Sequence, residues 1–287
     1  MVDRIGLRAA AITLLITAAV LALWFAATWV EGGAQPRQVD ASQEVEYVRL
    51  LGSEAATDAP QAGFPGPALM GQAVLKQLSN PFYDYGPNDK GIGLQLGHSL
   101  LRVGVGFLLA ALIAIPLGFV LGQSPLMQRA LHPFVHILKS ISPLAWMPLA
   151  LFTIKDSALS GVFVVFVCSL WPMLLHTVAG VAGVRKEWLN VAKTLEVSPA
   201  RKAFHLVLPA AAPAILAGMR NAMGIAWLVI VAAEMLVGGT GIGCFVWNEW
   251  NKLSLTGVML AILTVGVVGM LLDSLFAHLQ RRVSYVD

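Results

Sequence analysis

Residues 190–209 read NVAKTLEVSPARKAFHLVLP, and this polar segment decides how the rest of the chain is interpreted. It separates two apolar segments that are each long enough to cross a membrane. A charged segment between two spans is expected on the cytoplasmic side. Apolar positions such as Leu195 and Phe204 recur as in short helices, and Ser198 and Pro199 are suited to begin the second of them. The segment is therefore predicted to present a pair of helices to a cytoplasmic partner.

The composition indicates a membrane protein that crosses the bilayer several times. Of the 287 residues, 57% are hydrophobic and 12% are charged, whereas soluble domains carry about 25% charged residues. The net charge of +3 comes without a basic stripe interleaved with aromatic residues, so nucleic acid is excluded as a partner. The two cysteines, Cys168 and Cys244, are too few for a disulfide framework and lack metal-ligand spacing.

Six apolar segments are predicted to be membrane-spanning helices, which makes the fold class all-α and polytopic. A further short helix, after residues 64–67, is expected to lie on the outer membrane face. We divide the chain into an N-terminal part, residues 1–93, and a five-helix core, residues 94–287, whose cytoplasmic loop covers residues 185–209. The six predicted spans are residues 9–30, 94–122, 133–154, 158–184, 210–237 and 256–279.

The distribution of lysine and arginine orients these spans. With the amino terminus inside, ten of the nineteen basic residues fall on the cytoplasmic side, six fall outside and three fall within spans. Four of the outer six lie in a loop too long to weigh much in the positive-inside rule. Both termini are therefore predicted to be cytoplasmic. The ten inner residues are Arg4, Arg8, Arg129, Arg185, Lys186, Lys193, Arg201, Lys202, Arg281 and Arg282.

The segment at 190–209 resembles a cytoplasmic motif of permease subunits of ABC importers. That motif reads E-A-A, three residues, G, nine residues, then I-x-L-P. Here Asn190, Val191 and Ala192 take the E-A-A place, Glu196 takes the glycine place, and the segment ends in Leu208 and Pro209. The spacing is intact, although two of the usual residues are replaced.

The resemblance covers nearly the whole chain and is greatest to the nitrate, sulfonate and taurine group, with the nitrate (and bicarbonate) permeases nearest. It implies a type I ABC importer permease in a bacterial inner membrane that moves a small inorganic anion, nitrate (or nitrite) first, into the cytoplasm. It also implies a second permease copy, cytoplasmic ATP-binding subunits that hold ATP and Mg, and a periplasmic or lipid-anchored solute-binding protein. The similar passages are residues 81–93, 99–107, 116–118, 142–149 and 224–251.

By this resemblance the loop couples the permease to its ATPase. Because glycine would ease the turn between the two helices, Glu196 predicts a different turn, and Pro209 is expected to end the second helix. The residues expected to contact the ATPase are Asn190, Val191, Ala192, Leu195, Glu196, Ser198, Pro199, Phe204 and Pro209.

Residues within the spans are candidates for the translocation path, namely Arg102, Arg220, Trp227 and Glu234. Arg220, Trp227 and Glu234 are seven residues apart and so share one helix face. Arg220 is interpreted as a residue that attracts an anion as it passes, and Glu234 as a gate or an ion-pair partner. The alternative is a structural pair, for example Glu234 with Arg102. Asp273 is expected to pair with a basic residue of a loop.

Other motifs point away from catalysis. The glycine run at 238–243 has no preceding strand, so we interpret it as a flexible break that can take positive φ rather than as a phosphate cradle. His132 and His136 are four residues apart but have no third metal ligand in sequence. No nucleotide-binding or hydrolase motif occurs in the sequence, so no cofactor and no catalytic residue is assigned to this chain.

Three alternatives stay open at this point. The substrate of the same kind of permease could be bicarbonate, a sulfonate or taurine. A stand-alone secondary transporter or channel belongs to a different class, but no inverted repeat with paired broken helices is visible. A structural subunit of a membrane enzyme is the third, although no haem, metal or quinone ligands have usable spacing.

Overall fold

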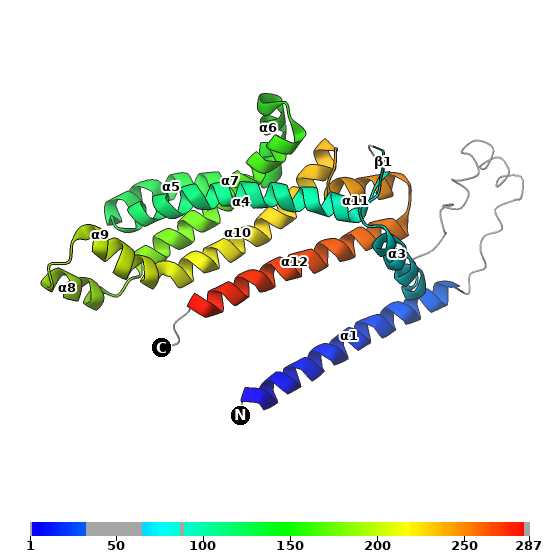
Figure 1. Cartoon of the computed structure of the whole chain (residues 1–287), viewed down its shortest axis with the longest axis horizontal. Coiled ribbons are helices and arrows are strands. Elements are labelled where there is room, and N and C mark those ends of the chain that lie inside the picture. The colour runs from blue at the N-terminus through cyan, green and yellow to red at the C-terminus, as the bar shows by residue number, and fades with distance from the viewer. Residues whose placement is uncertain (1, 33–64, 87–88, 284–287) are drawn as a thin grey trace, which may run out of the picture. The chain divides into compact units, whose positions relative to one another are not determined.

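The computed structural model describes residues 2–32, 65–86 and 89–283, and these are almost entirely helical (Figure 1). They group into two compact units. The first comprises the described parts of Met1–Pro81 together with Val246–Ile262, and the second those of Phe82–Phe245 with Leu263–Asp287. The sequence-based division at residue 93 stays a prediction.

The first unit contains a long and a short helix from the N-terminal part of the chain. Helix α1 (Val2–Gly32) carries the apolar segment Ala11–Thr28, whose side chains are mostly exposed within the chain, as a lipid-facing span requires. Helix α3 (Pro67–Ser79) begins with proline at its first position, where no N–H is needed. It is the short helix predicted after residues 64–67, of which Phe64 lies outside the described residues.

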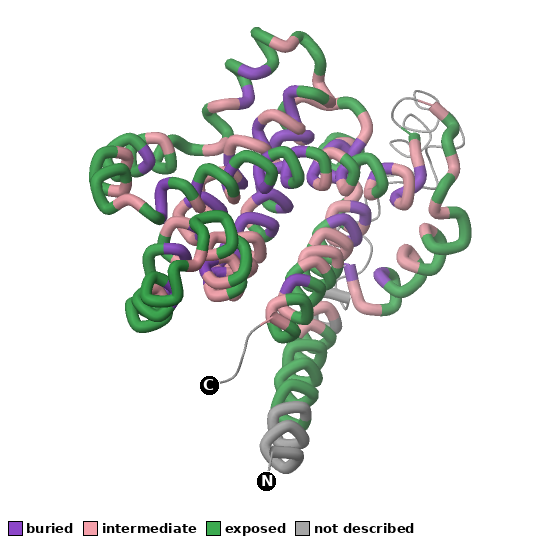
Figure 2. Tube along the Cα trace, turned by 60° about the vertical axis from the view of Figure 1, so that its left-hand side comes forward, coloured by how far each residue is buried: buried purple, intermediate pink, exposed green. Residues whose placement is uncertain are grey.

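The second unit is a bundle of helices that holds both candidate sites. Its main helices lie side by side in Figure 1 and carry most of the buried residues seen in Figure 2. Its helical elements are α4 (Ile92–Gly122), α5 (Pro125–Ser140), η2 (Pro143–Ala145), α6 (Trp146–Ile154), α7 (Ser157–Ala182), α8 (Lys186–Thr194), α9 (Pro199–Lys202), η3 (Ala203–Val207), α10 (Leu208–Val237), the start of α11 (Ile242–Asn251) and the end of α12 (Leu255–Val283).

Among the described residues, five helices are long and apolar enough to cross a membrane. The third predicted span is not among them, because it is divided by a bend. The third span, predicted over residues 133–154, is not a single helix, because the chain bends by 79° between α5 and the segment Pro143–Ile154. The physical reason is Pro143, which cannot donate a backbone hydrogen bond and disfavours helical geometry at Ser142. Six spans result only if this bent pair counts as one.

The core of the second unit lies where α7 packs against α4 and α10. Val164, Val165, Met173, Leu174 and Ile230 are almost completely inaccessible to solvent there. Interfaces between membrane helices are enriched in small residues because these let the backbones approach closely. The side of α4 that faces α7 follows this rule with Gly106, Gly118 and Gly122.

Replacing Gly118 with alanine is expected to destabilise the bundle by roughly 1–3 kcal/mol, because the new methyl group would overpack the interface. A Cβ atom there would lie 2.7 Å from Cβ of Thr177 and 3.1 Å from the carbonyl oxygen of Leu174. Gly104→Ala in the same helix is the matched control, because a Cβ at Gly104 meets nothing within 4 Å. The unfolding midpoint of the detergent-purified chain measures both, and equal midpoints would contradict the proposed close packing.

A small hairpin precedes α4 and was not predicted from the sequence. Strands β1 (Asp84–Gly86) and β2 (Asp89–Lys90) pair antiparallel, and Lys90 Nζ lies 3.4 Å from Asp84 Oδ2. Such a short strand carries too little hydrophobic alternation to be recognised by pattern. The hairpin leads directly into the first turn of α4.

Candidate functional site

The first candidate site is the loop formed by α8, α9 and η3. After α8, the amide of Glu196 donates to the carbonyl of Lys193 (3.1 Å) and the amide of Val197 donates to that of Ala192 (3.1 Å). These two bonds define a Schellman motif, which satisfies the last carbonyl groups of a helix. The motif needs a left-handed residue just after the helix end, and glycine is the usual choice.

Glu196 is that left-handed residue, with φ of +50°. The expectation that a non-glycine residue would give a different turn is therefore wrong: Glu196 adopts the conformation that glycine would take there. The two hydrogen bonds hold it, and the glutamate side chain itself is exposed. The turn thus keeps its geometry although the favoured residue is absent.

Glu196→Gly is expected to stabilise the folded chain by up to about 1 kcal/mol, because glycine adopts positive φ without the steric penalty. Part of this gain is offset by the greater freedom of glycine in the unfolded chain. Glu196→Ala is the control, since alanine removes the carboxylate but keeps the penalty. Unfolding midpoints in detergent compare the two variants, and equal stability of both would show that residue 196 carries no backbone strain.

The chain from α9 into α10 is one continuous helix that contains a π-helical segment, η3. The amide of Leu208 donates to the carbonyl of Ala203, five residues earlier. Pro209 was expected to end this helix, and that expectation is wrong, because it lies in the first turn of α10. The wider π winding just before it relieves the clash that a proline ring makes with the preceding turn.

Two sets of apolar side chains divide the loop into an anchored side and an exposed side. Val207 is buried with Val181, Val184 and Ala211, and Leu189 packs against the same cluster. By contrast, an apolar stripe faces solvent and does not lock the two helices together. Its members, with exposed fractions of 44–70%, are Trp188, Val191, Leu195 and Phe204, which we call the apolar loop face.

The apolar loop face has the properties of a docking surface. Trp188, Val191 and Leu195 recur at positions i, i+3 and i+7, which places them on one side of α8 and its C-terminal turn. Exposed apolar patches with a polar rim mark sites of protein interaction, and basic residues such as Lys193 and Arg201 provide that rim. Trp188 was not predicted, although its spacing to Val191 could have identified it.

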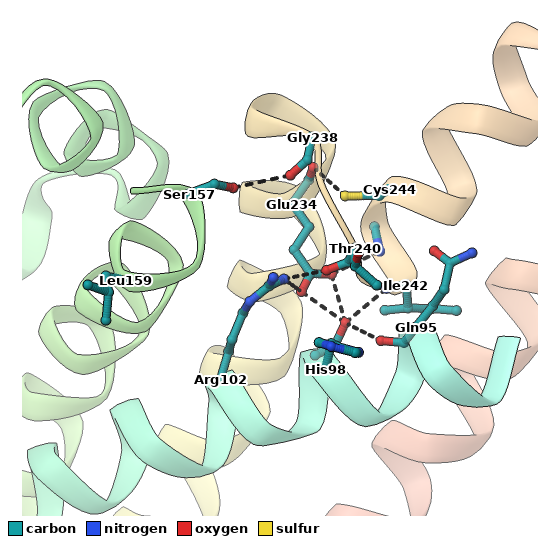
Figure 3. Close-up of polar contacts among 12 residues, drawn as sticks. Gln95, His98, Arg102, Ser157, Leu159, Glu234, Gly238, Thr240, Ile242 and Cys244 are labelled. Carbon is teal, nitrogen blue, oxygen red and sulfur yellow. Dashed lines mark hydrogen bonds and ion pairs between the residues drawn. The ribbon is translucent and has the colours of Figure 1, made fainter. Parts of the chain in front are cut away.

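The second candidate site is a buried polar network around Glu234 (Figure 3). The Glu234 carboxylate accepts a hydrogen bond from Arg102 Nη1 (2.7 Å) and lies 2.8 Å from Ser99 Oγ. Arg102 also donates to the carbonyl of Thr240 (2.6 Å). Both charged side chains are largely buried, with exposed fractions of 13% and 4%. The structural pair of Glu234 with Arg102, one of two alternatives left open by the sequence, is present.

The network also forms hydrogen bonds with the glycine-rich segment at 238–243, which includes the start of α11. The amide of Gly243 donates to Glu234 Oε2 (3.1 Å), and the amide of Ile242 donates to Ser99 Oγ (2.9 Å). The first amides of a helix lack partners within it, so the carboxylate and the hydroxyl cap α11. As predicted for this run, Gly238 takes positive φ, +77°. Added Cβ atoms at Gly241 or Gly243 would collide with Glu234.

The other two residues predicted to share a face with Glu234 contact α12. Arg220 pairs with Asp273 through two hydrogen bonds of 2.6 Å, so the expectation that Asp273 pairs with a loop residue is wrong. The indole N–H of Trp227 donates to the carbonyl of Val265 (3.0 Å). Long-range side-chain pairing of this kind has no local sequence signal. A role of these residues in translocation stays a prediction.

The histidine pair does not complete a metal site. His132 and His136 lie with their Nε2 atoms 3.1 Å apart on the exposed side of α5. Within residues 2–32, 65–86 and 89–283, no group of three potential ligands lies close enough to hold a metal ion. Both cysteines are free and buried.

Comparison with known proteins shows to which family this chain belongs. Residues 114–285 match the model described as "Binding-protein-dependent transport system inner membrane component". The chain belongs to this family. It is therefore a multi-pass membrane subunit of a transport system that works with a binding protein.

Curated relatives extend the similarity to most of the chain. The nitrate import permease protein NrtB of Synechocystis is 40% identical over 222 residues, 77% of this chain and 81% of the relative. NrtB of Leptolyngbya laminosa is 42% identical over 72% of this chain and 74% of its own. The bicarbonate transport system permease protein CmpB of Synechocystis is 40% identical over 72% of this chain and 74% of its own.

Solved structures support the fold. Two inward-facing crystal forms of the MetNI methionine ABC transporter superpose with TM-scores of 0.58 and 0.59. They cover 66% and 67% of this chain and 94% and 95% of theirs, at 14% and 15% identity. The predicted fold, a type I ABC importer permease, is confirmed.

Proposed function

We propose that this chain is the permease subunit of an ATP-driven importer that carries nitrate into the cytoplasm. The observation that carries the proposal is the 40–42% identity to nitrate import permeases over about three quarters of the chain. The family works with a binding protein, which would deliver the anion from outside. Two copies of this chain would form the path, with both termini and the loop at 185–209 in the cytoplasm.

The apolar loop face gives this proposal a physical means of coupling. Short amphipathic helices dock by their apolar side into a groove of a partner. The partner would be an ATP-binding subunit, which holds ATP and Mg and moves the loop as a rigid body. The loop is suited to this because the Schellman turn and the contacts of Val207 fix it to the bundle. Its basic rim favours an acidic rim on the partner.

Bicarbonate is the second candidate substrate, because a bicarbonate permease is 40% identical to this chain. Both anions are small and trigonal, so overall similarity does not separate them. The binding protein is expected to do most of the selection.

Uptake assays in cells that lack this chain test the proposal. Complementation should restore uptake of labelled nitrate, with labelled bicarbonate and taurine as parallel substrates. Restored uptake of bicarbonate alone would overturn nitrate as the substrate. Full transport without any ATP-binding partner would overturn the importer assignment and favour a secondary transporter.

A further inference from the structure

The second unit contains a cavity of about 360 Å³ that is separate from both sites described above. None of the residues of the Glu234 network or of the apolar loop face lines it. It is bounded by the end of α5, the bend before η2, and the middle parts of α7 and α10. Small-molecule sites occupy roughly 300–1,000 Å³, so the volume admits a small solute with some water.

The bend of the third span opens onto this cavity. Ile141 and Pro143, which flank the break between α5 and α6, both belong to its lining. Irregular backbone at membrane depth is tolerated only where it is buried in protein or lines a water-filled space. The cavity therefore accounts for the broken helix, because the irregular backbone lines it. This arrangement is expected for a path through a membrane protein.

The lining is apolar except for a few groups that suit an anion. Lys139 contributes a positive charge, and Asn221 and His176 contribute groups that can donate hydrogen bonds. No carboxylate lies among the lining residues. Asn221 is exposed on α10 within a predicted span, and polar residues in spans usually face the bundle interior or a water-filled path.

Trp171 supplies the observation that points to a ligand. It belongs to the cavity lining, and its indole N–H is buried without a hydrogen-bond partner among the described residues. A buried donor without a partner is unfavourable and needs an explanation, such as a ligand or ordered water. An oxygen atom of a bound solute could accept this hydrogen bond.

We propose that this cavity is a binding site for a small trigonal oxyanion on the translocation path, with Lys139, Trp171 and Asn221 as its polar contacts. The proposal rests on the function proposed above and gives the position at which the anion binds during transport. Nitrate accepts hydrogen bonds through all three oxygens and donates none. Bicarbonate must also donate one, and among the lining side chains only the Asn221 amide oxygen and a neutral His176 nitrogen offer a nitrogen or oxygen acceptor for it. The site should therefore prefer nitrate over bicarbonate.

Equilibrium dialysis tests the site on the purified permease–ATPase complex without the binding protein, with labelled nitrate or labelled bicarbonate. Lys139→Gln is expected to weaken nitrate binding about tenfold, since a hydrogen bond from a charged group is lost. Trp171→Phe keeps an aromatic ring but removes the N–H, and should weaken binding several-fold. Trp24→Phe is the matched control and should leave binding unchanged, because Trp24 also has an unpartnered indole N–H but lies in α1 outside the lining.

The outcomes separate this inference from the proposed function. If the unmodified transporter takes up nitrate and neither Lys139→Gln nor Trp171→Phe changes dialysis binding, the site is wrong and the function stands. If the complex binds and transports bicarbonate but not nitrate, both the nitrate function and the expected preference fail. Gel filtration of each variant shows that the complex is intact, and Trp171→Phe still decides the question if Lys139→Gln does not assemble.

Discussion

Leu195→Glu is expected to lower nitrate uptake at least tenfold while leaving the fold intact. Leu195 is 70% exposed in the single chain, so a charge there disturbs no internal packing. In a docked complex the same charge would be buried against an apolar groove without a partner. Truncation of a central interface residue costs about 2 kcal/mol or more, which corresponds to roughly thirtyfold in affinity.

Uptake and ATP hydrolysis by the reconstituted transporter measure the Leu195 effect, and co-purification of the ATP-binding subunit shows whether docking is lost. Leu195→Ile is the matched control and should retain uptake, because it keeps the apolar surface. A thermal midpoint unchanged by Leu195→Glu is part of the expected result. Normal uptake by Leu195→Glu would mean that the apolar loop face does not contact the ATPase.

Arg102→Met is expected to destabilise the chain by about 3–5 kcal/mol, because it leaves the Glu234 carboxylate buried without its cation. The carboxylate also caps α11, so the loss should loosen the glycine-rich break. The double variant Arg102→Met with Glu234→Leu removes both charges and should recover a large part of the loss. Unfolding in detergent at graded denaturant measures the two single variants, Arg102→Met and Glu234→Leu, and the double variant.

The Arg220–Asp273 pair provides the comparison for the buried network. Both of its side chains are partly exposed, at 39% and 54%, so neither charge is enclosed by the protein as Glu234 is. Arg220→Met should therefore change the unfolding midpoint far less than Arg102→Met. Equal effects of Arg220→Met and Arg102→Met on the unfolding midpoint would contradict a coupled buried network. So would a double variant whose loss of stability equals the sum of the losses in the Arg102 and Glu234 single variants.

The sequence was sufficient for what depends on composition and local pattern. Apolar runs predicted the spans, and Ser198 with Pro199 predicted the start of α9. The bend before Pro143 was harder, because proline is tolerated in membrane helices: α4 continues through Pro116 and α7 through Pro172. A proline in an apolar segment therefore does not by itself predict a break.

The contacts between distant residues were less predictable. Ser99 has no pattern that marks it as a partner of Glu234, and its role follows only from the packing of α4 against the start of α11. The same holds for Arg220, whose partner on α12 is 53 residues away. The conformation of Glu196 was misjudged because two backbone hydrogen bonds outweigh the steric preference of a single residue.

The π-helical segment η3 sets the rotational phase of the apolar loop face. An α-helix turns about 100° per residue, and the wider π winding absorbs one extra residue in Ala203–Val207, so the residues before this segment stand about one residue out of phase with uninterrupted α winding of the same sequence. Residues Pro199–Val237 form one continuous helical stretch. Changing the π segment to α winding without removing a residue would therefore turn α9 by about 100° relative to α10 and move Phe204 from its present side.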